Sequence, residues 1–153
     1  MLPAGRGTTG AMDEPATEHT RPDGTSDDAV AAAGRMTEAL ETLERARGHL
    51  YAFHQLIGET DFKLDTALEH LRACGEDELA AAIEREVVGR NVLPGRWTFQ
   101  IVEDFDAGYW TVFRDHERAV RDALVGGRRH VFEAEMKEDR RTHGAAGHEA
   151  RPG

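Results

Sequence analysis

A heptad pattern of apolar residues constrains the fold of this chain more than any other feature. From Met36 to Cys74, apolar side chains recur at alternating steps of three and four residues. This 3.5-residue period is typical of an α-helix that packs one stripe of side chains against another helix. No segment shows the apolar–polar alternation of a strand. The sequence therefore predicts an all-α protein, with a coiled-coil-like stripe made of Met36, Ala39, Leu43, Ala46, Leu50, Phe53, Ile57, Thr60, Leu64, Ala67, Leu71 and Cys74.

Gly58 is the position at which this stripe can divide into two helices. Gly58 suits a left-handed C-terminal cap, and Thr60 or Asp61 suits the N-cap of a following helix. The stripe keeps its phase through this segment, which favours one continuous helix instead. A break gives helices of matched length, as an antiparallel bundle requires, and we therefore expect the chain to fold back here. The prediction is an antiparallel up-down bundle of three long helices, 28–57, 60–88 (interrupted near residue 75) and 97–125, with a short fourth helix at 129–142.

The ends of the chain differ in composition from this helical region. Residues 1–26 and 143–153 are rich in Gly, Pro and polar residues and offer little to bury, so we expect both tails to be disordered. Residues 27–142 then form a single helical-bundle domain. The third helix is expected to present one apolar face, made of Ile101, Phe105, Gly108, Val112, His116, Ala119 and Ala123.

Charge excludes two classes of partner. The formal net charge is −10, and residues 59–88 are the most acidic stretch, with three Lys and Arg against nine Asp and Glu. Nucleic acids and anionic membranes require a basic face, so neither is an expected partner. No apolar window is long enough for a transmembrane helix or resembles a signal peptide, and a single cysteine cannot form an intrachain disulfide, so we expect a cytoplasmic protein. The bias toward Ala, Arg, Gly, Asp and Glu, with only two lysines, is typical of GC-rich bacterial genomes.

The sequence carries none of the common catalytic motifs, such as a phosphate-binding Gly-Lys-Ser/Thr loop or His-Glu-x-x-His. It therefore favours a non-enzymatic protein that acts through contacts with another protein or through self-association. Candidate partner-binding residues are Arg90, Asn91, Arg96 and Trp97 in one loop, and Arg128 and Arg129, which can also bind an anion, in another. An alternative interpretation needs no partner: Pro and Gly in the first loop end a helix, and the arginines are solvated. A third interpretation, a small-molecule sensor with a pocket inside the bundle, is not distinguished from the first by the sequence.

The alternative function is a metal-dependent enzyme or carrier. In the hairpin fold, His49, His70 and His116 all lie about 12 to 15 Å from the same end of the bundle, at 1.5 Å per residue. Three imidazoles suit one transition-metal ion of the zinc or iron type, with Glu135 as a possible fourth ligand. The competing interpretation makes His49 and His70 solvated and His116 a core residue, with no cofactor.

A second pair depends on the same hairpin. His54 and Asp61 are seven residues apart on either side of Gly58, so a turn there brings them together. We expect such a pair to hold the corner between two helices.

Overall fold

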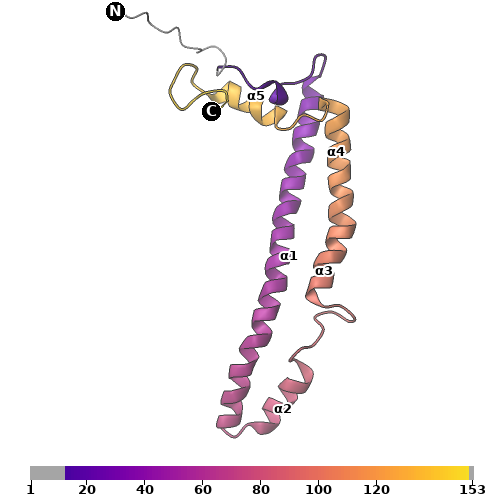
Figure 1. Cartoon of the computed structure of the whole chain (residues 1–153), viewed down its shortest axis with the longest axis vertical. Coiled ribbons are helices and arrows are strands. Elements are labelled where there is room, and N and C mark those ends of the chain that lie inside the picture. The colour runs from indigo at the N-terminus through magenta and orange to yellow at the C-terminus, as the bar shows by residue number, and fades with distance from the viewer. Residues whose placement is uncertain (1–12, 152–153) are drawn as a thin grey trace, which may run out of the picture. The chain divides into compact units, whose positions relative to one another are not determined.

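The computed structural model describes residues 13–151, and every regular element in that range is helical (Figure 1). The all-α prediction is confirmed. None of the described helices combines enough length with enough apolar character to cross a lipid bilayer. The disorder expected for residues 1–12 and 152–153 falls outside the described residues. The order of elements is η1 (Thr17–His19), α1 (Asp27–Ala73), α2 (Asp77–Glu86), α3 (Thr98–Phe105), η2 (Asp106–Trp110), α4 (Thr111–Val125) and α5 (Val131–Arg140).

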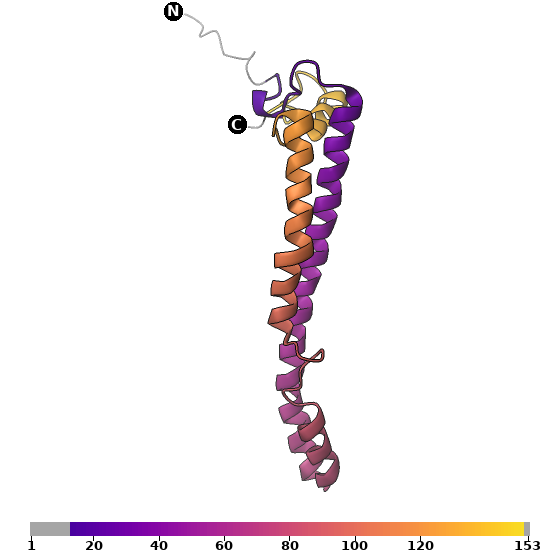
Figure 2. The same ribbon diagram turned by 90° about the vertical axis from the view of Figure 1, so that its right-hand side faces the viewer.

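The predicted break at Gly58 is wrong, because α1 runs without interruption from Asp27 to Ala73 (Figure 2). The Thr60 hydroxyl, expected to cap a new helix, instead donates to the carbonyl of Leu56 at 2.7 Å, a bond made within a continuing helix. The chain turns only at Gly75, which has a φ of +89°. There the amides of Gly75 and Glu76 donate to carbonyls of the last turn of α1, which confirms the interruption predicted near residue 75.

The chain divides into two compact units. The first, which we call the terminal unit, comprises Met1–Leu40 and Phe113–Gly153, and the second, the central unit, is Glu41–Val112. The predicted domain, 27–142, includes residues of both. Helix α1 contributes residues to both units.

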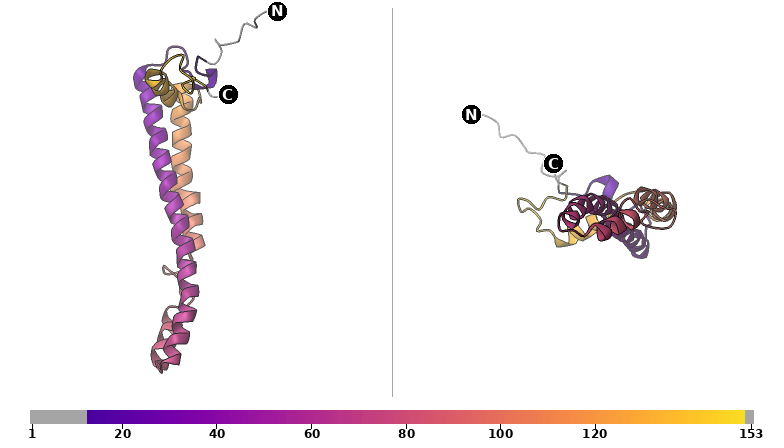
Figure 3. Two further views of the ribbon diagram at one scale, coloured as in Figure 1. Left: turned by 90° about the vertical axis from the view of Figure 1, so that its left-hand side faces the viewer. Right: turned by 90° about the horizontal axis from the view of Figure 1, so that it is seen from below.

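The terminal unit closes a small apolar core. Its first part of α1 packs with the end of α4 and with α5 (Figure 3). Gly34 allows the closest approach, since a Cβ at this position would lie 2.7 Å from the Phe132 side chain. These apolar side chains cover one another, whereas Met136 on α5 stays 48% exposed. The core consists of Val30, Ala33, Val125 and Val131, with Leu124 and Phe132 packed against it.

Ion pairs tie the segments around α5 together. Residues 13–26, which composition alone predicts to be disordered, include η1 and supply two partners to these pairs. Arg21 binds Glu135 through two bonds of 2.6 and 2.8 Å. Arg141, whose side chain is almost fully buried, donates to Asp13 at 2.8 Å and to Glu138 at 2.6 Å. These guanidinium groups therefore add charged hydrogen bonds to the apolar contacts of Val131 and Phe132 in holding this part of the chain.

The central unit is built differently, because it buries few of its side chains. After the turn at Gly75, α2 returns beside the last turns of α1, where Arg72 and Glu84 form an ion pair of 2.7 Å (Figure 2). Leu68 and Ala80 are buried in this part, and Val102 is buried on α3. Eleven large apolar side chains of this unit are exposed to solvent: Tyr51, Phe53, Leu56, Phe62, Leu79, Val87, Leu93, Trp97, Phe99, Tyr109 and Val112.

The predicted third helix exists, as α3, η2 and α4 in direct succession, but its buried face changes at η2. This element is a π-helical turn, which inserts one extra residue into the helix. A 3.6-residue period that starts at Ile101 therefore predicts buried positions beyond the turn that are wrong by one residue. Val112, His116, Ala119 and Ala123 are exposed, whereas Phe113, Glu117, Val120 and Leu124 are buried or half-buried.

The continuity of α1 gives a direct test at Gly58. A Cβ there meets nothing within 4 Å, and an alanine favours a helix interior, so Gly58→Ala should raise the free energy of unfolding by about 0.5–1 kcal/mol. Gly75→Ala is the matched control, because φ at Gly75 is positive, and it should lower stability by a similar amount. Urea unfolding followed by circular dichroism measures both. Destabilisation by Gly58→Ala would contradict a continuous helix.

Candidate functional site

The stripe of α1 is divided between a covered and an uncovered side. Two neighbouring rows of the heptad, which include Leu43, Leu50 and Ile57 in one and Arg47 and His54 in the other, are half-buried by the rest of the central unit. The other apolar row of the stripe, Ala46, Phe53, Thr60 and Ala67, is exposed, and so is the row beside it. We call these two exposed rows the acid-free face of α1; it consists of Thr42, Ala46, His49, Phe53, Leu56, Thr60, Lys63, Ala67 and His70.

The charge of this face differs from that of its surroundings. The central unit has seven Lys and Arg against fourteen Asp and Glu, a net charge of −7. Six of those carboxylates are on the α1 part of the unit, and all six lie on other rows of the helix. The face itself presents Phe53, 40% exposed, and Leu56, 58% exposed, near its middle, with alanines toward both ends. A partly apolar strip that carries no carboxylate, with Lys63 as its one permanently charged residue, is a surface suited to contact with another helix.

The predicted loop candidates, Arg90, Asn91, Arg96 and Trp97, lie together in the central unit but are not equally available. Arg96 is paired with Asp104 at 3.0 Å, and Arg90 donates to the carbonyl of Glu86 at 3.2 Å. Trp97 is 60% exposed and contacts the ring of Phe99 edge-on, at 5.3 Å between centroids. Arg90, Asn91 and Trp97 line a hollow of about 190 Å³ against α1. Trp97 therefore offers an exposed aromatic ring to a partner.

The α1 side of that hollow contains the pair expected to hold a helical corner. His54 and Asp61 do not meet, because both lie on one continuous helix. The His54 ring nitrogen Nδ1 bonds the Thr98 hydroxyl at 2.6 Å, and Asp61 accepts from the amide of Gly89 at 2.8 Å. His54 thus fastens the start of α3 to α1, and Asp61 fastens the loop that follows α2.

A cluster around Arg47 went unnoticed in the sequence. Arg47 of α1 makes two bonds to Asp106 of η2, at 2.7 and 2.8 Å, and its guanidinium lies 4.2 Å from the Trp110 ring centroid and 5.1 Å from that of Tyr51. The Trp110 indole donates to Glu44 at 2.9 Å. The hydrogen bonds from Arg47 outweigh burial and lower the pKa of Asp106. The bidentate pair and the stacked ring hold η2 on α1.

No protein family, curated protein or solved structure matches this chain.

The histidine trio of the metal interpretation does not assemble. Because α1 is unbroken, His49 and His70 are 21 positions apart on one helix, which separates them by roughly 31 Å. His116 is exposed on α4 rather than buried, because of the phase change at η2. Glu135 is bound to Arg21. Residues 13–151 contain no group of three His, Cys, Asp or Glu side chains placed to hold one ion.

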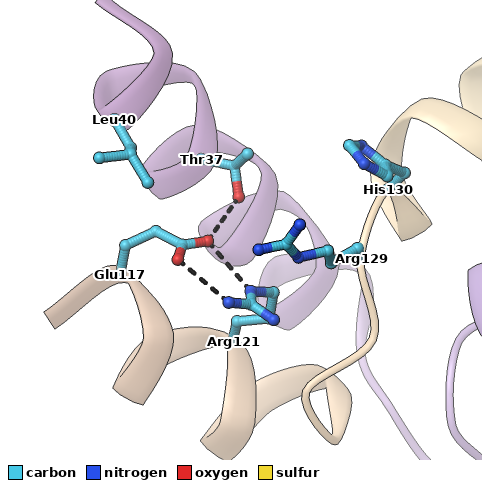
Figure 4. Close-up of a pocket in the computed structure, with 6 residues that line it drawn as sticks. All are labelled: Thr37, Leu40, Glu117, Arg121, Arg129 and His130. Atoms are coloured by element: carbon cyan, nitrogen blue, oxygen red, sulfur yellow. Dashed lines mark hydrogen bonds and ion pairs between the residues drawn. The ribbon is translucent and has the colours of Figure 1, made fainter. Parts of the chain in front are cut away.

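The second pair of predicted candidates, Arg128 and Arg129, lies in the terminal unit between α4 and α5. Arg128 is used structurally, since it donates to the carbonyl of Thr20 at 2.8 Å. Arg129 instead extends toward the ion pair of Glu117 and Arg121 (Figure 4). Together with Thr37, Leu40 and His130 these residues line a hollow of about 160 Å³.

The Arg47–Asp106 pair predicts a dependence of stability on acidity. A carboxyl group whose pKa is lowered by folding contributes fully at pH values above its unfolded pKa, near 3.9, and loses that contribution as the pH falls through the lowered folded value. Asp106→Asn should therefore lose about 1 kcal/mol at pH 7 and show a weaker loss of stability on acidification than the wild type.

Asp104→Asn provides the matched control two residues away. Asp104 and its partner Arg96 are both more than half exposed, so this substitution should change stability by less than about 0.5 kcal/mol. Urea unfolding at pH 7 and pH 3 measures the three proteins. Equal effects of the two substitutions would mean that the Arg47 pair does not hold η2.

Proposed function

We propose that this protein acts by self-association, in which two copies pair through the acid-free face of α1. The observation that carries the proposal is the contrast between the two units. Among its described residues the terminal unit leaves one large apolar side chain exposed, Met136, whereas the central unit leaves eleven exposed, Phe53 and Leu56 of the face among them. Burial of such side chains against a partner is the main favourable contribution to association.

Charge favours a second copy as the occupant. A basic partner would be attracted to the acidic rows of α1, which are the rows outside this face. Two copies that meet along it place no carboxylate opposite a carboxylate, although each central unit carries a net charge of −7. The face is thus the part of α1 where like-charged units approach without direct repulsion.

The order of residues on the face favours an antiparallel pair. With a twofold axis between Leu56 and Ile57, Ala46 of one copy lies opposite Ala67 of the other, and Phe53 lies opposite Thr60. The two Lys63 side chains are then about 20 Å apart, beyond a Debye length at physiological ionic strength. A parallel pair would place the two lysines side by side. Twofold pairing of identical surfaces is also the commonest symmetry of protein dimers.

The size of the face sets the expected strength. From Thr42 to His70 it is about 42 Å long, and a contact strip about 10 Å wide covers roughly 400 Å² on each copy. A total near 800 Å² lies below the range of about 1,200–2,000 Å² that stable specific interfaces bury, so we expect weak, reversible association with a micromolar Kd.

Substitution of Leu56 tests the interface. Leu56→Glu places two negative charges near the twofold axis, and the protein should remain monomeric from 5 to 200 µM in sedimentation equilibrium while its helical circular dichroism is unchanged. Phe62→Glu is the matched control, because Phe62 is 78% exposed on another row of α1, and it should associate like the wild type. A monomeric wild type at 200 µM, or association of Leu56→Glu, would overturn the proposal.

Cys74 reports the orientation of the pair. It is the sole cysteine, it is exposed, and it follows the last residue of α1. Spin labels attached there should be about 50 Å apart in the antiparallel pair and within about 20 Å in a parallel one. Double electron–electron resonance distinguishes the two, and a short distance would contradict the antiparallel arrangement.

A further inference from the structure

The hollow in the terminal unit is enclosed by residues from three segments. Thr37 and Leu40 come from α1, Glu117 and Arg121 from α4, and Arg129 and His130 from the loop before α5 (Figure 4). His130 adopts a left-handed backbone conformation, with a φ of +59°, and follows the positive-φ glycines Gly126 and Gly127. This loop directs the Arg129 side chain into the space between α1 and α4 (Figure 4).

The charges around the hollow do not balance. Glu117, which is only 6% exposed, accepts from the Thr37 hydroxyl at 3.0 Å and from Arg121 at 3.1 Å. Arg121 makes a further bond to the carbonyl of Gly127 at 2.9 Å. Within the part of the chain that the structure describes, the Arg129 guanidinium makes neither a hydrogen bond nor an ion pair. One carboxylate thus faces two guanidinium groups. The N–H donors of Arg129 are available to hydrogen-bond another acceptor.

The ionisation state of Glu117 agrees with this excess of one positive charge around the hollow. Burial by itself would raise the pKa of Glu117, but the hydrogen bonds from Arg121 and Thr37 and the positive charges of Arg121 and Arg129 outweigh it. The pKa of this carboxyl is therefore lowered, and Glu117 is negatively charged at neutral pH. A ligand would accordingly meet a local charge of +1.

We propose that this hollow binds a small organic carboxylate, whose oxygens accept the paired donors of Arg129 and whose short apolar tail lies against Leu40. A volume of about 160 Å³ corresponds to about five water molecules, which suits a ligand of roughly six heavy atoms. The planar fork of a guanidinium matches a carboxylate in two parallel hydrogen bonds. The site belongs to the terminal unit and does not depend on the proposed pairing of α1.

Butyrate is the probe that tests this site. In titrations of the full chain with sodium butyrate, against sodium chloride of equal ionic strength, the amide signals of residues 127–131 in ¹H–¹⁵N spectra should shift and saturate with a millimolar Kd. Arg129→Gln should weaken this binding at least tenfold, since it removes the charge-assisted bonds. Arg129→Lys, which keeps the charge but loses the fork, should give an intermediate Kd and guards against a loss of binding caused by misfolding.

Arg118→Gln is the matched control, because Arg118 is on α4, is 57% exposed and does not line the hollow. It removes the same charge and should leave the butyrate Kd unchanged. Inorganic phosphate, which lacks an apolar tail, should bind at least fivefold more weakly than butyrate. Absence of saturable butyrate shifts, equal loss of binding in Arg118→Gln and Arg129→Gln, or phosphate binding as strong as butyrate binding would each overturn the proposal.

Discussion

The continuity of α1 is the constraint on which the rest of the structure depends. A single helix from Asp27 to Ala73 fixes the distance between any two of its residues at 1.5 Å per position, so residues such as His49 and His70 cannot meet. It also keeps every row of the heptad continuous along the helix, with a drift of about 20° per heptad around the axis. The segments that pack on the half-buried rows all lie on one side of α1, and the rows on the other side stay exposed from turn to turn. The long exposed face of α1 thus follows from the helix remaining unbroken.

The two units solve the burial of apolar side chains in different ways. In the terminal unit, the chain turns at Gly126 and Gly127 and returns as α5, so three segments enclose Val30 and Val125. In the central unit, α2 and α3 cover one side of α1, and polar contacts such as Arg47–Asp106 and His54–Thr98 contribute much of the attachment. These polar contacts fix the position of α3 and η2 on α1 but bury little apolar area. An attachment made in this way leaves apolar surface available for a partner.

The sequence predicted the helical class and most helix ends, because Pro, Gly and heptad periodicity are local signals. The Gly75 turn and the start of α3 after Pro94-Gly95 are examples. The break predicted at Gly58 is wrong because matched helix lengths are a weaker signal than the unchanged phase of the stripe, which indicates one continuous helix. The π-turn at η2 had no comparable signal, since it depends on contacts of Asp106 and Trp110 with α1. Every position assigned beyond it by simple periodicity was displaced by one residue.

Candidate residues could be recognised by type but not by availability. Arg96, Arg128 and Arg129 look alike in the sequence, yet the first two are bound to Asp104 and to the Thr20 carbonyl, and Arg129 alone of the three lacks such a partner among residues 13–151. The difference arises from long-range contacts, as does the exposure of Phe53 compared with the half-burial of Leu50. In the proposed pair, the same long-range arrangement opposes the addition of a third copy. Once the acid-free face is covered, the remaining exposed rows of the α1 part of the central unit carry five of its six carboxylates, and a third copy would meet like charge.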